Sequence, residues 1–302
     1  MSNSPPRHRC PFCSVETARA WGRVHGRLAY ECEGCDVVFF PRPIETSADY
    51  EQYYPYLKDF DGARFEWELR IRARKYRHQL GAIRRYRPDA RKLTDVGAGP
   101  GYLCKVAMDA GWKALGIEAS SPAVEAGRRE FGVRYVELDN VEPGSQDAIT
   151  CHHVLEHLEE PASFLETLRS KLVSGGILVV HVPNREPLTY LARNVLRRTR
   201  ERDADLYCQL YYPEHITGFT RRSLAAALQH VGFEPLRVSC VSMWSRFYDP
   251  FFLGNYFRDG AGRRIAKVEY GRLVRQVVQS VGENVGNLFG RGDWVVGHFR
   301  LR

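Results

Sequence analysis

Three histidines and a glutamate stand close together between residues 152 and 157. His153 to His157 read H-x-x-E-H, a string that one class of zinc peptidases uses to bind its metal with two histidines and to place a glutamate as base. Here the string begins at the end of the apolar stretch 147–154, which we expect to be a sheet strand. Because nothing before or after it supplies a peptidase framework, we do not predict peptidase zinc at this point.

Two cysteine pairs near the N-terminus have the spacing of a zinc site. Cys10 and Cys13, like Cys32 and Cys35, are separated by two residues, which lets both thiolates of a tight turn face one ion. A segment of about 35 residues has no adequate core, so a metal must supply its folding energy. We predict a closed, structural zinc ribbon. A redox dithiol or disulfides are the alternatives, and neither explains two similarly spaced pairs in a chain without secretory features.

A glycine-rich turn indicates a nucleoside site. Asp95 and three alternating glycines, Gly97, Gly99 and Gly101, follow an apolar stretch and precede an amphipathic one, and Glu118 comes nineteen residues after Gly99. Glycines allow the backbone to approach a ligand closely, and an acid at the end of the next strand can accept both ribose hydroxyls. The order G-x-G-x-G after an acid, in place of G-x-G-x-x-G, favours a nucleoside carrying an amino acid over a dinucleotide.

The elements that position these residues alternate along the chain from residue 92 onward. We expect strands within 92–99, 112–120, 133–139, 147–154, 177–184, 234–244 and 294–301, and helices within 102–111, 121–132, 161–176 and 220–233. This alternation predicts an α/β fold with a seven-stranded, mostly parallel sheet and flanking helices, whose ligands bind at the carboxyl ends of the strands.

The expected organisation is a ribbon over 1–45, a linker and basic helix over 46–92, and the α/β body over 93–302, with substrate-site insertions at 185–213 and 245–290. Residues 64–92 carry eleven Lys or Arg and three acids, which accounts for the net charge of +8. That helix suits an anionic partner, although a solvated helix face explains it equally well. No run approaches the roughly 20 apolar residues that span a bilayer, so we expect a cytoplasmic protein.

The motifs taken in order resemble a known family. "DVGAGPG", "GIEAS", "DAITCHHVLEHLEEP" and "LVSGGILVVHVPN" resemble the successive motifs of class I S-adenosylmethionine-dependent methyltransferases over about residues 93–235. The four-Cys ribbon and "YYPEHITGFTRRSL" resemble a zinc-ribbon branch found in small-molecule biosynthesis, including nucleotide-sugar C-methyltransferases with a Tyr-x-Glu-His string. The resemblance implies a Rossmann-like fold with S-adenosylmethionine as cofactor and a structural Zn²⁺.

The same resemblance implies roles for individual residues. Asp95 and the three glycines are expected at the methionine end of the cofactor, Glu118 at the ribose and Asp139 at the adenine, with His152 and His153 beside the cofactor. His215 is the first candidate for the general base, with Glu214 beside it, Tyr212 as a hydrogen-bond donor and His157 as the second candidate. The alternative is that Glu214 and His215 cap or brace the helix that starts near Thr220. His181, inside a strand, is expected to be a packed core histidine.

These expectations favour methyl transfer to a small biosynthetic intermediate that is anionic, by C- or O-methylation, with a nucleotide-linked sugar as one option. An RNA base methyltransferase is the alternative, because certain ribosomal RNA methyltransferases also combine a zinc ribbon with this core and the basic helix fits phosphate contact. A non-catalytic binding module is the third option, and the intact glycine motif and Glu118 argue against it.

Overall fold

The computed structural model describes residues 7–24, 26–41, 62–188, 214–241 and 285–302. The predicted linker with its tyrosines, most of both predicted insertions, and Tyr212 lie outside the described residues. Among the described residues, no helix combines the length and the apolar character needed to cross a bilayer.

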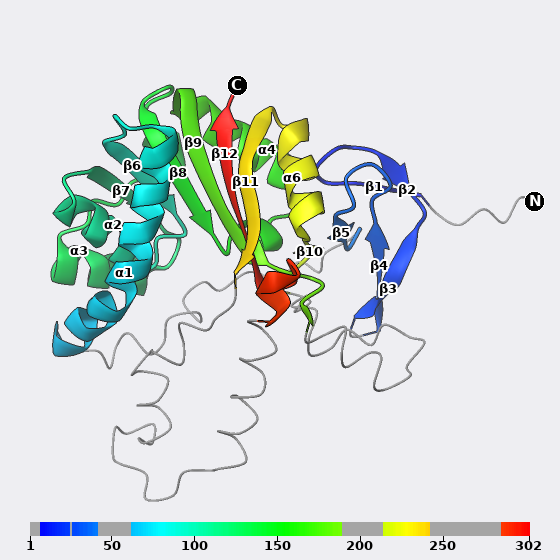
Figure 1. Ribbon diagram of the computed structural model, residues 1–302, viewed down its shortest axis with the longest axis horizontal. Coiled ribbons are helices and arrows are strands. Elements are labelled where there is room, and N and C mark those ends of the chain that lie inside the picture. Colours follow the sequence, from blue (N-terminus) through cyan, green and yellow to red (C-terminus); the bar gives the residue numbers. More distant parts are fainter. Residues whose placement is uncertain (1–6, 25, 42–61, 189–213, 242–284) are drawn as a thin grey trace, which may run out of the picture.

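The centre of the fold is a six-stranded mixed sheet in the order β11-β12-β9-β8-β6-β7 (Figure 1). Its strands are β6 (Lys92–Val96), β7 (Lys113–Ile117), β8 (Gln146–His152), β9 (Leu172–Pro183), β11 (Phe233–Val241) and β12 (Trp294–Leu301). β6 pairs in parallel with β7 and β8, and β8 with β9. Only β12 runs in the opposite direction, between β9 and β11. The predicted α/β architecture with a mostly parallel sheet is therefore confirmed.

The segment expected to be the third strand makes only one ladder step beside β7. Gly116 and Tyr135 form a single parallel bridge, flanked by hydrogen bonds from the Gly116 amide to the Arg134 carbonyl (2.9 Å) and from the Val136 amide to the Gly116 carbonyl (3.0 Å). The chain then turns into the short 3-10 helix η3 (Leu138–Asn140). Of the seven predicted strands this one is reduced to a single bridge, because the chain turns into η3 directly after it.

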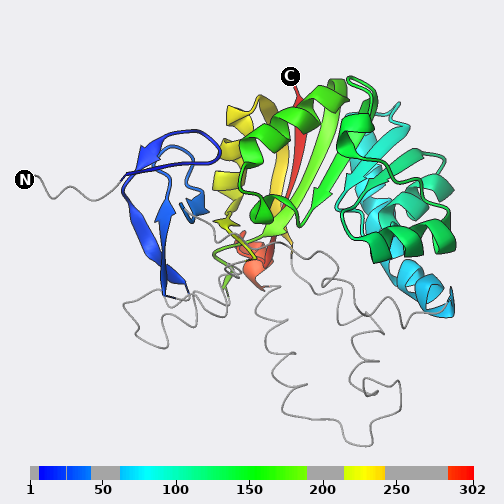
Figure 2. The same ribbon diagram turned by 180° about the vertical axis from the view of Figure 1, so that it is seen from behind.

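Helices cover both faces of the sheet, and each face has its own core. α1 (Gly62–Tyr86), α2 (Tyr102–Asp109) and α3 (Ser121–Phe131) pack on one face around residues such as Phe65, Leu103 and Ile177. α4 (Pro161–Lys171) and α6 (Arg221–His230) pack on the other around Leu165 and Leu224. Figures 1 and 2 show α1 and α4 on opposite sides of the sheet. α1 buries Leu80 and Ile83 among its apolar residues.

The N-terminal ribbon is built from β1 (His8–Arg9), β2 (Glu16–Thr17), β3 (Ala20–Val24), β4 (Arg27–Glu31) and β5 (Val38–Phe39). Its antiparallel sheet has the order β10-β5-β4-β3, so it includes β10 (Thr217–Gly218), which comes from the body of the protein. Ribbon residues Phe12 and Phe39 share one core with Phe219 and Leu224. The ribbon is therefore joined to the body by a shared sheet and a shared core.

Candidate active site

The glycine motif forms a turn at the carboxyl end of β6, directly before α2. Gly97, Gly99 and Gly101 have φ values of 71°, 54° and 79°, a left-handed conformation that glycine adopts without the penalty of a Cβ. A Cβ at Gly97 would lie 2.6 Å from Val154 Cγ2, and one at Gly101 would lie 2.8 Å from the Tyr135 hydroxyl. Glycine is thus required here both by conformation and by close packing.

Glu118 is anchored beside this turn by both of its carboxylate oxygens. The Gly99 amide donates to Oε2 (2.7 Å) and the Ser120 amide donates to Oε1 (2.9 Å). The Tyr135 hydroxyl donates to the Gly99 carbonyl (2.8 Å), and this hydrogen bond holds the turn in place. A carboxylate has about four acceptor sites, so Glu118 keeps capacity for two further donors, such as a pair of ribose hydroxyls.

Asp95 lies beneath the glycine turn and is 4% exposed. The Thr150 hydroxyl donates to its Oδ1 (2.6 Å) from the neighbouring strand β8. Burial raises the pKa of Asp95 to about 7, opposed by the hydrogen bond from Thr150 and reinforced by the charge of Glu118. A buried carboxylate of this kind is suited to an ammonium ligand, because a nearby cation favours its ionised form.

The histidines of the H-x-x-E-H string lie at a strand end and in a short turn. β8 ends at His152, and His153 has a φ of 54°, so the chain turns sharply before the 3-10 helix η4 (Leu155–His157). A zinc peptidase needs both histidines on one α-helix. The structure lacks that helix at this point, which agrees with the sequence interpretation.

His152 and His181 stand side by side where β8 and β9 end, and the register pairs them directly. Their rings are 5.5 Å apart, and the Gln79 side-chain amide of α1 donates to His152 Nε2 (2.8 Å). His181 is buried, as expected for a core histidine, and it also contacts Trp294 of β12. Burial lowers the pKa of both imidazoles well below the usual value, and the positive charge of Lys75 on α1 contributes to this.

Glu156 is a buried carboxylate surrounded by imidazoles. It is 1% exposed, with His153 Nδ1 at 3.3 Å and His157 Nε2 at 4.0 Å from its Oε1. Burial by itself raises the pKa of Glu156, but the imidazoles of His153, His157 and His215 outweigh burial and lower it.

The structure brings the two candidate bases together. The rings of His157 and His215 are 4.7 Å apart at an interplanar angle of 79°, and possible ligand atoms of Glu156, His157 and His215 all lie within 4.8 Å of one another. His157 Nδ1 donates to the backbone carbonyl of Glu214 (2.8 Å), since a carbonyl can only accept. The Glu214 side chain itself is exposed.

Neither Glu214 nor His215 supplies the N-cap of α6. Thr220 caps that helix through the Ser223 amide (3.2 Å), and the Ser223 hydroxyl in turn accepts from the Thr220 amide (2.8 Å). This is a capping box made by the helix's own first residues. Capping therefore does not explain the position of His215.

Asp139 lies farther along the sheet edge, in η3, and is exposed. Its backbone carbonyl accepts a hydrogen bond from Lys171 Nζ (3.3 Å). The expected role at the adenine stays a prediction.

The four ribbon cysteines form one cluster of free thiols, so the disulfide alternative is not observed. Their sulfur atoms lie within 4.8 Å of one another, with Cys10 and Cys35 at 3.6 Å and Cys13 and Cys32 at 3.3 Å. A hydrogen bond from Cys35 lowers the pKa of Cys10 to about 5, whereas burial raises the pKa of Cys32 to about 12.

The two cysteine turns have matching backbone geometry. The Ser14 amide donates to the Cys10 carbonyl (3.1 Å) and the Asp36 amide to the Cys32 carbonyl (2.9 Å), and Ser14 and Asp36 share a positive φ of 61° and 57°. Backbone amides also point at the sulfur atoms of Cys10 and Cys32. Two equivalent turns that bring four sulfur atoms together, three from buried cysteines and one from the half-buried Cys13, fit a tetrahedral Zn²⁺.

Sequence reasoning missed several residues that shape this region. Thr150 could have been found, because it lies on the strand that was expected beside Asp95. Gln79 and Trp294 carry no local signal. They reach the histidines only because α1 folds over the strand ends and β12 inserts next to β9.

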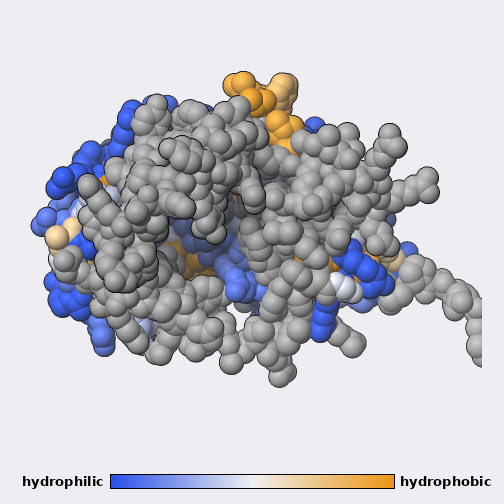
Figure 3. Space-filling model, turned by 90° about the horizontal axis from the view of Figure 1, so that it is seen from below, coloured by the Kyte–Doolittle hydropathy of each residue, from blue (hydrophilic) through white to orange (hydrophobic). Residues whose placement is uncertain are grey.

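The glycine turn lies at the carboxyl ends of the parallel strands together with Glu118 and the histidines of β8 and η4, and this is the edge at which α/β sheets bind ligands. This edge is the lower one in Figure 1, and the view from below shows a hollow in which hydrophilic and hydrophobic described residues are both visible (Figure 3). The histidine end of β8 packs directly on the glycine turn, since a Cβ at Gly97 would also lie 3.5 Å from the His152 carbonyl.

Comparisons with known proteins agree with this geometry. Residues 68–238, more than half of the chain, match a family described as a methyltransferase domain. The ubiquinone biosynthesis O-methyltransferase of Xanthomonas campestris pv. campestris (strain B100) is 28% identical over 50% of this chain and 69% of its own length. That of Methylococcus capsulatus is 29% identical over 48% and 68%.

Among solved structures, the phosphoethanolamine N-methyltransferase 2 of Haemonchus contortus, in complex with S-adenosyl-L-methionine, is similar with a TM-score of 0.51. It is 13% identical, and the match covers 87% of this chain and 62% of that one. At this identity the likeness establishes the fold alone.

Proposed function

The chain belongs to the class I S-adenosylmethionine-dependent methyltransferases, and on that premise we propose that it methylates an oxygen of a small, anionic biosynthetic intermediate. Methyl transfer itself follows from the family. The relatives named as ubiquinone biosynthesis O-methyltransferases support oxygen as the methylated atom and a small molecule as the acceptor. They give no support to a nucleotide-linked sugar.

The residues at the end of β6 and β7 fit the cofactor. Glu118, held by the Gly99 and Ser120 amides, would bind the ribose, and the glycine turn would allow close approach of the methionine part. The buried Asp95 would pair with the amino group of the methionine, because burial raises its pKa and a cation beside it would favour the ionised form. When bound, S-adenosylmethionine supplies an activated methyl group, so the protein has to align the acceptor and remove its proton.

The observation that carries the proposal is the pairing of His215 with the Glu156–His157 turn. An acceptor hydroxyl must lose its proton during O-methylation, and an imidazole is the side chain best suited to accept it near neutral pH. His215 is half-buried and lies against His157, within range of the Glu156 carboxyl group. A carboxylate beside an imidazole stabilises the imidazolium that forms when the base takes up a proton.

The charge around the strand ends supports an anionic acceptor. Lys75 lies one helical turn before Gln79 on α1, and Gln79 contacts His152. Burial lowers the pKa of both His152 and His181, and the positive charge of Lys75 lowers it further. A carboxylate or phosphate on the acceptor would offset this crowding of basic groups.

We also propose that the ribbon binds one structural Zn²⁺ through Cys10, Cys13, Cys32 and Cys35. The four clustered sulfur atoms complete a closed set of ligands, which leaves no open position for a substrate. The proposed zinc therefore takes no part in methyl transfer.

Tritium transfer from methyl-labelled S-adenosylmethionine tests the proposed acceptor. The protein is incubated separately with small-molecule extracts and with total RNA, and His215→Asn and Glu118→Ala serve as controls in both. We expect label in an anionic small molecule, in a product that carries an O-methyl group, and its loss in both variants. Label confined to RNA, or to carbon or nitrogen of the product, would overturn the proposal.

A further inference from the structure

His215 stands immediately before residues that belong to the ribbon's sheet. β10 begins two residues after His215, and Thr217 and Gly218 pair with Phe39 and Val38 of β5. β10, the strand that follows the candidate base, is thus hydrogen-bonded to β5 of the N-terminal ribbon, although about 180 residues separate the two strands in sequence.

Ile216 connects the ribbon to the Glu156–His157 turn. Its amide donates to the Glu156 carbonyl (2.8 Å), and its carbonyl accepts from the Phe40 amide (3.1 Å). Next to it, the Thr217 hydroxyl donates to the Leu155 carbonyl (3.3 Å). The residue after His215 is therefore held by η4 on one side and by the ribbon on the other.

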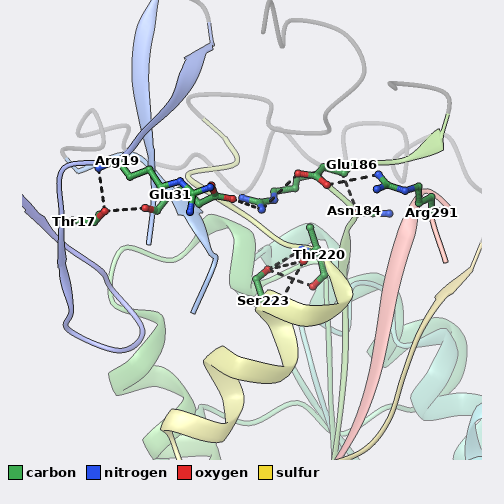
Figure 4. Close-up of polar contacts among 9 residues, drawn as sticks. Thr17, Arg19, Glu31, Asn184, Glu186, Thr220, Ser223 and Arg291 are labelled. Carbon is green, nitrogen blue, oxygen red and sulfur yellow. Dashed lines mark hydrogen bonds and ion pairs between the residues drawn. The ribbon is translucent and has the colours of Figure 1, made fainter. Parts of the chain in front are cut away.

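A buried ion pair makes a second connection between the ribbon and the body. Arg185, just after β9, donates from Nη2 to Glu31 Oε1 of β4 at 2.6 Å, and the two side chains are 4% and 12% exposed. The Arg185 amide donates to the Phe219 carbonyl (2.8 Å), just after β10. Glu31 also pairs with Arg19 (3.1 Å), but Arg19 belongs to the ribbon and its side chain is 58% exposed. Figure 4 shows this network running from Thr17 and Arg19 through Glu31 towards Glu186 and Arg291.

The cysteine turns pack against the same segment. Phe12, between Cys10 and Cys13, meets the ring of Phe219 edge-on at 5.4 Å. The Cys32 amide donates to the Val37 carbonyl (2.9 Å), which leads directly into β5. The cysteine turns thus hold β5 in position, and β5 pairs with β10.

We propose that the four-Cys ribbon is a positioning element of the active site, which fixes β10 and thereby holds His215 against the Glu156–His157 turn. The functional half of this inference rests on the proposed role of His215, whereas the positioning half rests on the contacts alone. Loss of the metal, or of the Glu31–Arg185 pair, releases residues 214–219. The cofactor residues stay in place, because Asp95 and Glu118 are held by Thr150, Gly99 and Ser120 of the body.

The matched variants Arg185→Met and Arg19→Met test the positioning. Each removes one partner of Glu31, but only Arg185 connects the ribbon to the body. With zinc content verified, we expect Arg185→Met to speed amide hydrogen exchange of residues 214–219 by about tenfold or more. Its affinity for S-adenosylhomocysteine by calorimetry should stay within about twofold of wild type, as expected for a distant site. Arg19→Met should change neither, and Arg185→Lys should restore much of the protection.

Removing zinc from the wild type with a chelator should expose the same residues to exchange. Unchanged exchange at 214–219 in both Arg185→Met and the zinc-free protein would overturn the inference, and so would a parallel loss of cofactor affinity. If Arg185→Met does not fold, Glu31→Gln carries the same test and leaves the body sequence intact. If exchange rises as expected but His215→Asn keeps full methyl transfer, the assignment of the base fails and the positioning stands.

Discussion

Glu118→Ala tests the cofactor half of the site most directly. In the structure each carboxylate oxygen of Glu118 accepts one backbone amide, from Gly99 and Ser120, and the proposed ribose contact uses the remaining lone pairs. Hydrogen bonds to a charged group contribute about 1.5–3 kcal/mol. At about 1.4 kcal/mol per factor of ten, the variant should bind S-adenosylhomocysteine roughly 10- to 150-fold more weakly.

Isothermal titration calorimetry measures this loss, with two further variants for comparison. Glu118→Gln keeps one acceptor oxygen and should fall between wild type and alanine. Glu125→Ala removes an exposed acid on α3, close in sequence but outside the site, and should bind as wild type does. A folded Glu118→Ala protein with wild-type affinity would refute the ribose assignment, whatever the family resemblance.

Four further predictions follow from the described residues. Asp95→Asn should stabilise the cofactor-free protein above pH 7. The pKa of Asp95 is raised from 3.8 to about 7, so ionisation of Asp95 lowers the free energy of unfolding, by at most about 4 kcal/mol for three pKa units. That gain should shrink as the pH falls from 7 and vanish below 4 in urea titrations, and equal stability of the two proteins at pH 8 would contradict it. His215→Asn should lower the rate of methyl transfer by about 10²–10⁴-fold at nearly unchanged cofactor affinity, and a rate within threefold of wild type would argue against a base. Metal analysis of untagged, reduced protein should find about one zinc per chain, and Cys32→Ser should lose it; metal-free wild type would exclude the zinc proposal. Gly127→Ala should cost about 1–3 kcal/mol in denaturant unfolding, because its Cβ would lie 2.7 Å from the Pro100 carbonyl and would also press on the Tyr135 hydroxyl; a neutral change would mean that the Tyr135 contact yields easily.

The sequence alone determined much of the fold and predicted which residues meet at the glycine turn. The glycine turn, Asp95 and Glu118 are local features of two successive strand ends, so alternation of strands and helices was enough to place them side by side. The cysteine spacing likewise predicted a four-sulfur cluster. The same local reasoning excluded the peptidase interpretation of the H-x-x-E-H string, since a strand ends at His152.

Only the tertiary structure decided what surrounds the histidines. Gln79, His181 and Trp294 come from a helix and two strands that are far apart in sequence, and no periodicity links them. His157 meets His215 although the two lie far apart in sequence, and β10, just after His215, joins the ribbon's sheet. Strands of two residues carry no sequence pattern that predicts such a pairing. Residue spacing predicts contacts between neighbouring elements, whereas contacts between distant segments arise from packing of the whole chain. The surroundings of His152, His157 and His215 are of the second kind.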